Sequence, residues 1–469
     1  MKKTLLLLAA LLWLLAPGQM LADGGKREFR GAWMQCVNGM YLGKSTAEVQ
    51  QMLTRQLDEL EKDGVNAIIF QVRGECDALY ASKIEPWSRY LTGVQGQAPN
   101  PYWDPMSWMI VQCHKRGMEF HAWINPYRAR MKSPTRLAPN HILSLHPERA
   151  FEYGGLYVLN PGLKENRDYI LSVVDDIVSR YDIDGIHIDD YFYPYPDGGR
   201  PIPDDREYQL YNNGIQDRGD WRRYNVNLFV KEMGEHVHRL KPWVKFGVSP
   251  FGIYRNKKSA PIGSDTNGLQ NYDQLYADVL LWVNNGWVDY CVPQLYWQIG
   301  HKLADYDTLI RWWSKHMAAR PLFIGESIEN TVRYPDPANP ATHQMAAKFK
   351  LHRQLANVQG TVLWYAKVAA EDMGSYGTLL RKVYWTHPAL PPAMPFLDNH
   401  APKKPRKVST VWNEDGYMLF WQSPKGSRWG DEARRYVVYR FGRGERVNLN
   451  DASKIVKITY DPFYRLPYQ

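Results

Sequence analysis

The chain has 469 residues, a formal net charge of +9 and an excess of aromatic side chains, with 18 Trp and 31 Tyr. This length exceeds one average domain and can hold a barrel of about 250 residues or more plus a small module. Without Lys2 and Lys3 the charge falls to +7 (9 − 2), and no basic run is dense enough to indicate nucleic-acid binding. Because aromatic rings also stack on sugars, the composition points weakly toward carbohydrate.

The N-terminus has the pattern of a secretory signal peptide. Lys2 and Lys3 precede an apolar run from Leu5 to Leu15, and cleavage is expected near Ala22, so residues 1–22 form the predicted signal. The apolar run is too short to span a bilayer stably, and no second run follows it. No Cys lies in this region to carry a lipid anchor. We therefore expect an exported protein, periplasmic or extracellular, without a transmembrane span.

The four cysteines give no sign of a metal site. They are widely spaced, and their neighbours suggest small buried residues on strands, strand ends and one helix: Cys36, Cys76, Cys113 and Cys291. An exported protein can form disulfides, but this spacing does not indicate one. The sequence has no clustered His and carboxylate residues, P-loop or dinucleotide fingerprint in a suitable context, so we expect neither a metal nor a cofactor.

A strand followed by a helix recurs eight times between residues 27 and 388. The first strand covers 29–34, and Ser45 and Glu48 then form a capping box that opens a helix ending near Gly64. The other strands are expected at 65–72, 118–124, the run ending at Asp189, 244–250, 288–296, 321–326 and 360–365. The other helices are expected at 104–117, around 170–178, and at 220–240, 272–285, 305–319, 342–357 and 377–385.

This alternation predicts an α/β fold, a (β/α)8 TIM barrel over residues 27–388. Long inserts after the third, fourth and fifth strands would build walls on the catalytic face. A Pro-rich linker follows at 389–407, and residues 408–469 alternate as in a small all-β sandwich. Trp421, Tyr436 and Tyr439 resemble the early strands of a fibronectin type III module. Such modules need on the order of 90 residues, so this one is expected to be incomplete.

The stretch from Tyr181 to Pro194 carries the main functional signal. Its alternation predicts a strand with Gly185, His187 and Asp189 on the face that lines the barrel. Asp189 would then lie at the C-terminal opening, where such barrels keep their chemistry, with Asp190 beside it on the rim. The alternative is a strand-end Asp that only caps the next loop.

Carboxylates at several strand ends suit glycoside hydrolysis, which needs a carboxylic acid and a second, ionised carboxylate. We expect Asp189 to be the ionised partner, held anionic by Arg73. Glu326, Glu75 and Asp190 are the candidates for the acid. Glu75 has an alternative role in a salt bridge with Arg73 or Arg128, and Glu326 has one as a helix-entry carboxylate.

A ring of further polar and aromatic residues is expected to bind substrate. These residues lie at or near strand ends: Arg73, Asn125, Tyr127, His187, Tyr191, Gln294, Tyr296, Trp297 and Trp364. Each one alone is more often a core residue than a ligand contact, and together they make a more persuasive rim. His187 has two interpretations, a hydrogen bond to Asp189 or a satisfied core histidine.

Several motifs resemble the glycosyl-hydrolase-like family 10. They are FRGAW (29–33), FQVR (70–73), ALY (78–80), EPW (85–87), WINPY (123–127), DGIHIDDYFYP (184–194) and PQLYW (293–297). The resemblance implies a (β/α)8 barrel, an exported enzyme and often a trailing fibronectin-like domain. The family includes a divisome-localised glycosyl hydrolase that acts on peptide-free peptidoglycan strands. The lipidation Cys that some members carry is missing here.

The same stretch is also similar to the chitinase signature Asp-Gly-x-Asp-x-Asp-x-Glu. His187 replaces the middle Asp, and Tyr191 replaces the Glu that donates the proton. This departure argues against substrate-assisted chitinase chemistry.

The sequence therefore predicts an exported glycoside hydrolase that acts on a polysaccharide, with peptide-free peptidoglycan strands as one candidate. The alternative is a carbohydrate-binding barrel of the cell envelope without catalysis. Neither hypothesis requires a nucleic acid partner or a transmembrane span.

Overall fold

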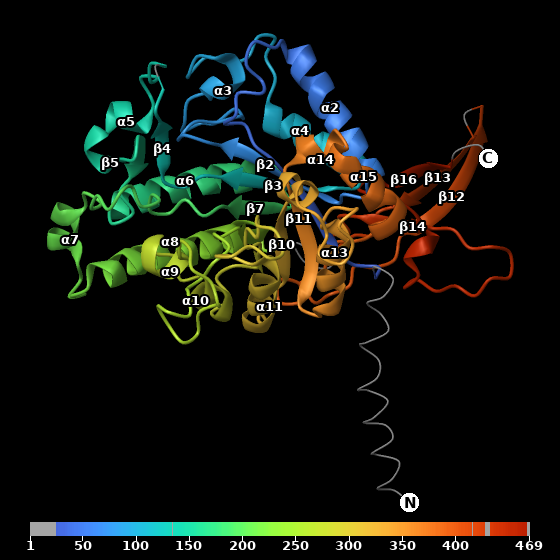
Figure 1. Cartoon of the computed structure of the whole chain (residues 1–469). Helices are drawn as coiled ribbons and strands as arrows, with labels where there is room; N and C mark the ends of the chain where they lie inside the picture. The colour runs from blue at the N-terminus through green and yellow to red at the C-terminus, as the bar shows by residue number, and fades with distance from the viewer. Residues whose placement is uncertain (1–24, 134, 415, 427–431, 467–469) are drawn as a thin grey trace, which may run out of the picture.

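A closed barrel of eight parallel strands forms the centre of the computed structural model (Figure 1), which describes residues 25–133, 135–414, 416–426 and 432–466. This confirms the predicted (β/α)8 barrel, whereas the predicted signal peptide lies outside the described residues. In order around the barrel the strands are β1 (Phe29–Met34), β2 (Ala67–Arg73), β3 (Glu119–Ile124), β7 (Gly185–Ile188), β8 (Lys245–Val248), β9 (Tyr290–Cys291), β10 (Leu322–Ser327) and β11 (Val358–Trp364).

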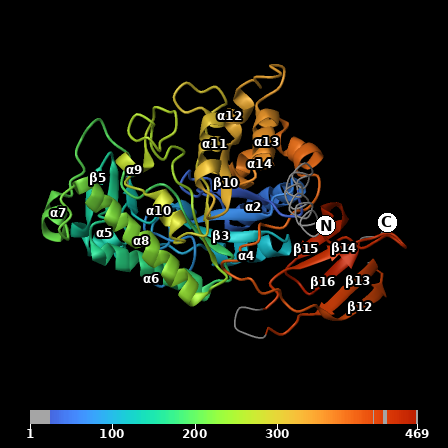
Figure 2. The ribbon, with the colours of Figure 1, turned by 90° about the horizontal axis from the view of Figure 1, so that it is seen from below.

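Helices surround the barrel, as the two views in Figures 1 and 2 show. The capping box predicted for the first is present, because Ser45 accepts from the Glu48 amide and Glu48 accepts from the Ser45 amide. The helices that follow or precede barrel strands are α2 (Thr46–Lys62), α4 (Pro105–Lys115), α6 (Lys164–Arg180), α8 (Arg218–Leu240), α9 (Asn271–Gln274), α10 (Val279–Asn284), α11 (Tyr306–His316), α12 (Ile328–Arg333), α13 (Met345–Gln354), α14 (Ala366–Ala370) and α15 (Tyr376–Leu379).

Two predicted helices differ from the structure. The helix expected at 272–285 is split into α9 and α10, because Tyr276 has a φ of +56° and Asp278 caps a new helix by accepting from the Leu281 amide. The helix expected at 377–385 is the short α15, followed by a π-helical turn over Leu380–Tyr384.

The long inserts form one side of the molecule. A three-stranded sheet lies in the insert after β3, with α5 (Ile142–Leu145) beside it, and α7 (Asp205–Tyr211) lies in the insert after β7 (Figure 1). The strands of this three-stranded sheet are β4 (Arg128–Met131), β5 (Ala150–Tyr153) and β6 (Leu156–Leu159).

The interior of the barrel contains a column of hydrogen-bonded polar side chains. Starting from its base, Glu119 bonds His121 at 3.0 Å, His121 bonds the Tyr290 hydroxyl at 2.8 Å, and that hydroxyl bonds His187 at 3.0 Å. His187 then bonds the Ser249 hydroxyl at 2.8 Å. Phe29 and Phe323 stack face to face beside this column, with ring centroids 4.2 Å apart.

Two strand positions beside this column require glycine. A Cβ at Gly247 would lie 1.9 Å from the Tyr290 ring, and one at Gly185 would lie 2.4 Å from the His121 ring. The rings therefore occupy space that any other residue would fill.

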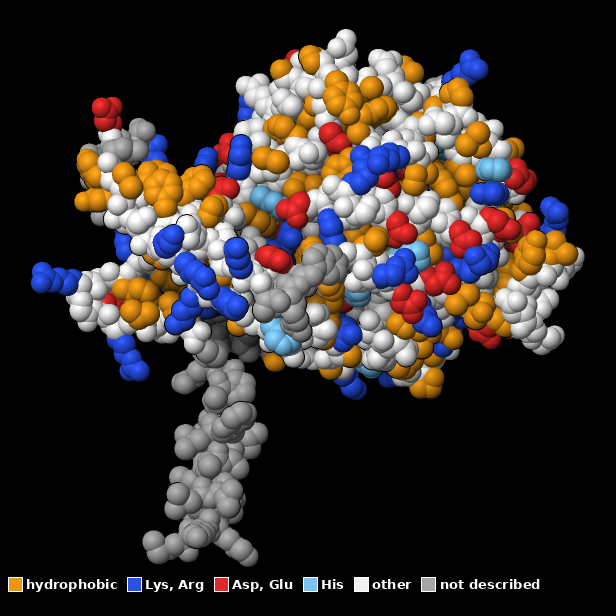
Figure 3. Space-filling view, turned by 180° about the vertical axis from the view of Figure 1, so that it is seen from behind, with side chains coloured by type: hydrophobic (Ala, Val, Ile, Leu, Met, Phe, Trp, Pro, Cys, Tyr) orange, Lys and Arg blue, Asp and Glu red, His pale blue; other side chains and the backbone are white. Residues whose placement is uncertain are grey.

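The C-terminal residues form a lobe of two small antiparallel sheets. One contains β12 (Arg406–Asn413), β13 (Gly416–Gln422) and β16 (Phe463–Leu466), and the other contains β14 (Tyr436–Tyr439) and β15 (Ile455–Thr459). Trp421, Tyr436 and Val438 pack between them. Figure 3 shows Lys and Arg side chains and apolar patches gathered on this lobe. Its resemblance to a fibronectin module stays a prediction.

The lobe lies against the N-terminal base of the barrel (Figure 2). Arg435 donates to Glu119 at 2.6 Å, and the Tyr460 hydroxyl donates to Asp184 at 2.9 Å. Burial alone would raise the pKa of Glu119, but Lys245 and Arg435 lower it well below its usual range.

Among the described residues, every helix is too short or too polar to cross a membrane. All four cysteines lie within those residues, and each is buried with a free thiol that is not part of a disulfide.

We predict that Arg435→Ala destabilises the protein by about 1–3 kcal/mol, because Glu119 loses a charged partner in a buried position. Urea unfolding measures this loss. The exposed Arg440 lies on the same lobe, so Arg440→Ala is the matched control and is expected to change stability by less than about 0.5 kcal/mol. Equal effects of the two substitutions would contradict a structural role for the Arg435–Glu119 pair.

Candidate active site

Asp189 directly follows β7 at the C-terminal opening of the barrel. The predicted inward face of this strand is confirmed, because His187 contacts the barrel-lining Tyr290 and Trp33. Strands β3 and β7 are in register with Trp123 opposite His187 and Ile124 opposite Ile188. That register places the next pair, Asn125 and Asp189, side by side.

The carboxyl group of Asp189 is 4% exposed, and one of its oxygens accepts two side-chain hydrogen bonds. Trp123 Nε1 donates to its Oδ2 at 3.2 Å, and Asn125 Nδ2 donates to the same atom. Burial and the charge of Asp190 raise the pKa of Asp189 to about 7, whereas Arg128 and Asn125 act to lower it. Asp189 therefore exchanges its proton near neutral pH.

Asp190 is buried beside it, with 2% of its surface exposed. The Tyr195 hydroxyl donates to Asp190 Oδ2. Burial raises the pKa of Asp190, and the side chains of Tyr195 and Gln294 act against this rise. Two adjacent buried carboxyl groups resist ionising together, so the pair holds a proton and a negative charge near neutral pH.

Aromatic rings from strands β1, β3 and β11 and from the loop after β9 surround this pair. The rings of Tyr296 and Trp364 stack with centroids 6.0 Å apart, and both side chains are only partly buried. Trp33 contacts both rings edge-on, at 6.4 and 6.1 Å, and Trp123 contacts Trp364 at 6.3 Å. Burial is the main cause that raises the pKa of Tyr296, and the charges of Asp190 and Asp189 raise it further. The phenol of Tyr296 is therefore close enough to interact electrostatically with both carboxyl groups.

Three further predicted residues lie around this opening. Gln294 donates to the Ser249 carbonyl at 2.9 Å, and Trp297 packs edge-on against Phe251 at 5.4 Å. Arg128 lies over the Tyr191 ring at 5.1 Å.

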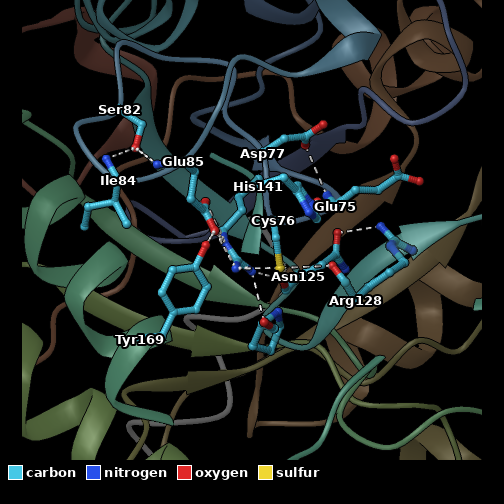
Figure 4. A network of polar contacts seen from close by, with 12 residues as sticks. Glu75, Cys76, Asp77, Ser82, Ile84, Glu85, Asn125, Arg128, His141 and Tyr169 are labelled. Carbon is cyan, nitrogen blue, oxygen red and sulfur yellow. Dashed lines mark hydrogen bonds and ion pairs between the residues drawn. The ribbon is translucent and has the colours of Figure 1, made fainter. Parts of the chain in front are cut away.

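The expected contact between Arg73 and Asp189 is wrong. A register shift between Gln71 and Arg73 places Arg73 opposite Ile124, a residue of the helix-facing core. Such a bulge turns the side chain to the other face of the strand. There Arg73 binds both oxygens of Glu85, at 2.7–3.0 Å, and Glu85 also accepts from the Tyr169 hydroxyl at 2.6 Å (Figure 4).

Glu75 is bound to neighbours other than those expected. Arg89 donates to both of its oxygens, at 2.9 and 3.0 Å, and the Tyr90 hydroxyl and Met131 amide donate to Oε1 at 3.2 and 2.8 Å. The alternative predicted for Glu75, a salt bridge, therefore holds with Arg89 in place of Arg73 or Arg128. Its hydrogen bonds tie the loop after β2 to the insert that contains β4.

Glu326 faces the surrounding helices and not the barrel opening. It pairs with Leu363 of the helix-facing core, whereas the preceding Gly325 pairs with the inward Val362. Lys348 of α13 donates to Glu326 Oε1 at 2.7 Å, and Thr331 of α12 donates to the same oxygen. The position of Glu326 is therefore a correction to its expected role as the acid.

Two predicted substrate-binding residues lie in the core. His187 is fully buried and bonds Tyr290 and Ser249 instead of Asp189, so its interpretation as a core histidine is the correct one. Tyr127 is also fully buried and packs on Phe229 with ring centroids 5.2 Å apart. The Tyr127 side chain points out of the barrel and contacts α8 through Phe229.

Sequence reasoning missed several residues of this site. Trp33 and Trp123 share the inward parity of their strands, and this signal could have found them. Gln71 shows the same signal, because it lies opposite Trp123. Arg128 and Tyr195 lie beyond the ends of the barrel strands β3 and β7, where the periodicity of those strands does not predict their direction.

No group of three or more His, Cys, Asp or Glu residues in the described part of the chain is placed to hold a metal ion.

Comparison with known proteins decides the class of this barrel. The model of the glycosyl hydrolase-like 10 family matches residues 28–338. The chain belongs to this family. Glycosyl hydrolase YngK of Bacillus subtilis strain 168 is 39% identical over 435 residues, which cover 90% of this chain and 85% of that protein. Glycosyl hydrolase DigH of Escherichia coli K12 is 38% identical over 339 residues, which cover 68% of this chain and 76% of that protein.

This family member is a glycosidase. Among solved structures, the catalytic domain of β-amylase from Paenibacillus polymyxa is similar with a TM-score of 0.48 at 13% identity. The similarity covers 76% of this glycosidase and 98% of that chain.

We predict that Asp189→Asn raises the melting temperature at pH 8 but not at pH 4. The pKa of Asp189 is raised to about 7 in the folded protein from an ordinary value near 3.8, so its ionisation costs stability increasingly between about pH 4 and pH 7. A neutral amide avoids this cost. Calorimetry at both pH values measures the difference, and a variant that loses stability more at pH 8 than at pH 4 would contradict it.

Proposed function

We propose that this glycosidase is exported and hydrolyses O-glycosidic bonds of a polysaccharide with two carboxyl groups, Asp189 and Asp190. Peptide-free peptidoglycan strands are the first substrate to test. The observation that carries the proposal is the buried Asp189–Asp190 pair at the end of β7, beside partly exposed aromatic rings, where burial and the charge of Asp190 raise the pKa of Asp189 to about 7.

Asp189 acts as the general acid in this proposal. Glycoside hydrolysis requires protonation of the leaving oxygen while positive charge develops on the sugar. The raised pKa of Asp189 keeps a proton available near pH 7, and Asp190 supplies the negative charge that faces the oxocarbenium-like sugar. The sequence predicted the reverse for Asp189, an ionised partner, with Asp190 among the candidates for the acid. The assignment changes because Arg73 does not contact Asp189 and so does not hold it anionic.

The aromatic rings support a sugar substrate. Tyr296 and Trp364 present partly exposed rings next to the carboxyl pair, and flat apolar faces of this kind pack on pyranose rings. Glu75 and Glu326 are each bound to a cation of their own, so we assign them to holding loops in place.

The activity test uses the purified protein with peptide-free glycan strands and a panel of polysaccharides. We expect wild type to release reducing ends, and Asp189→Asn to lose about 10²–10⁴-fold in rate while it still binds the glycan. Asp265 is exposed and far from this pair in sequence, so Asp265→Asn is the matched control and should keep full activity. Binding without product from any glycan would favour the non-catalytic barrel.

The rate is also expected to depend on pH. Because Asp189 must be protonated to act as an acid, kcat/KM should fall as pH rises through about 7. A pH–rate profile of the wild type on the best substrate of the panel measures this. A rate that stays constant from pH 6 to pH 9 would rule out Asp189 as the acid.

A further inference from the structure

A chain of three buried side chains leads from the segment after strand β1 to Asp189, and each link has a fixed direction. It begins at Gln71 of β2, whose Oε1 accepts from the backbone amides of Cys36 at 2.9 Å and Val37 at 3.4 Å. Those amides can only donate, so the oxygen of the Gln71 amide must face them. The Gln71 Nε2 group consequently points the other way, toward Asn125.

The second link is Asn125, whose Oδ1 receives two donors. Gln71 Nε2 donates to it at 2.6 Å and Arg128 Nη2 donates to it at 2.7 Å (Figure 4 shows the contact with Arg128). Arg128 is held in turn, because its Nε donates to the Gly74 carbonyl at 3.0 Å. With its oxygen occupied in this way, Asn125 can present only Nδ2 to Asp189.

The backbone around Asn125 is fixed as well. Arg73 Nη1 donates to the carbonyl oxygens of Asn125 and, at 3.0 Å, of Pro126. The Asn125 and Gln71 side chains are essentially inaccessible to solvent, so no water competes for either amide. The orientation of the Asn125 amide is therefore determined by protein groups alone.

The third link is the carboxyl group of Asp189. Asn125 Nδ2 and Trp123 Nε1 both donate to Oδ2, whereas Oδ1 accepts a single longer hydrogen bond, from the Tyr191 amide at 3.5 Å. A carboxyl oxygen that receives two N–H groups serves as the carbonyl oxygen, so the proton resides on the other one. In Asp189 that oxygen is Oδ1.

We propose that Gln71 is a positioning residue: through Asn125 it fixes Oδ2 of Asp189 as an acceptor and so places the acid proton on Oδ1. This inference rests on the proposed function. In the reaction the proton passes from Oδ1 to the glycosidic oxygen as the bond from that oxygen to the anomeric carbon breaks. The bonding electrons leave with the oxygen, water completes the hydrolysis, and the Asp189 carboxylate left behind already has two donors on Oδ2.

In the described part of the chain, Gln71 forms no hydrogen bond with the other charged or titratable groups around Asp189. They are Asp190, Arg128, Tyr191, Tyr195 and Tyr296. Gln71 is itself neutral and has no contact with Asp189. A change in the pH dependence of a Gln71 variant therefore reports the orientation of Asn125.

The test compares Gln71→Met, which keeps the side-chain length and removes the amide, with the wild type. We expect the rate on the best natural glycan to fall about tenfold. The alkaline limb of the pH–rate profile should move up by about one unit, because the Asp189 carboxylate loses a well-aligned donor. The rate on a dinitrophenyl glycoside of the same sugar should change less than twofold, since that leaving group needs no proton.

Two further variants make the result decisive. Gln56→Met replaces a buried glutamine of α2 away from the site and should leave both rates and the profile unchanged. Gln71→Glu keeps the size of the side chain but cannot donate to Asn125 when ionised. It should lower the glycan rate at least as much as Gln71→Met and replaces that variant if Gln71→Met melts well below the wild type.

Equal losses on both substrates, or an unchanged profile, would overturn the role of Gln71. If Asp189→Asn is then inactive on the glycan, the proposed function stands and only the positioning inference fails. Full glycan turnover by Asp189→Asn would instead overturn the proposed function, and the inference with it.

Discussion

The burial of two adjacent carboxyl groups is the constraint on which the rest of this site depends. Asp189 and Asp190 follow a strand of only four residues, and both are almost inaccessible to water. Uncompensated charges are costly in such a position, so the surrounding elements supply donors to each group. Strand β3 provides Trp123, the residue directly after it provides Asn125, and the loop after β7 provides Tyr195. The register between β3 and β7 decides whether these donors arrive beside their acceptors.

Much of the barrel could be predicted because strand and helix periodicity report on burial directly. Each expected barrel strand is present, and the inward parity of His187 and Asp189 was readable from alternation alone. The direction of Glu326 was not, because Leu322 and Phe323 are equally apolar on the two faces of β10. Arg73 was misplaced since a bulge leaves no signature in the sequence, and its partner Glu85 comes from a loop whose course depends on tertiary packing. The helix predicted at 272–285 is interrupted because Tyr276 adopts a positive φ, a backbone conformation that the helix propensity of its sequence does not indicate.

The buried carboxyl groups of the barrel differ in whether an Arg or Lys side chain is their direct partner. Glu75, Glu85 and Glu326 are as buried as Asp189, yet each has an Arg or Lys as a direct partner. Asp189 and Asp190 have amide, indole and phenol donors instead, with Arg128 acting on them only from a distance. Neutral donors stabilise a carboxylate without forcing it to stay ionised, which leaves proton exchange possible. Burial by itself therefore does not distinguish Asp189 and Asp190 from Glu75, Glu85 and Glu326, whereas the charge of their direct partners does.

The polar column inside the barrel has a direction that is set at its base. Glu119 can only accept, so with neutral imidazoles His121 gives it the Nε2 proton and accepts from Tyr290. Tyr290 must then accept from His187 Nδ1, which leaves His187 Nε2 to accept from Ser249. The tautomer of a ring just below the C-terminal opening is thus set by an acid at the opposite end of the barrel, where the C-terminal lobe contributes Arg435.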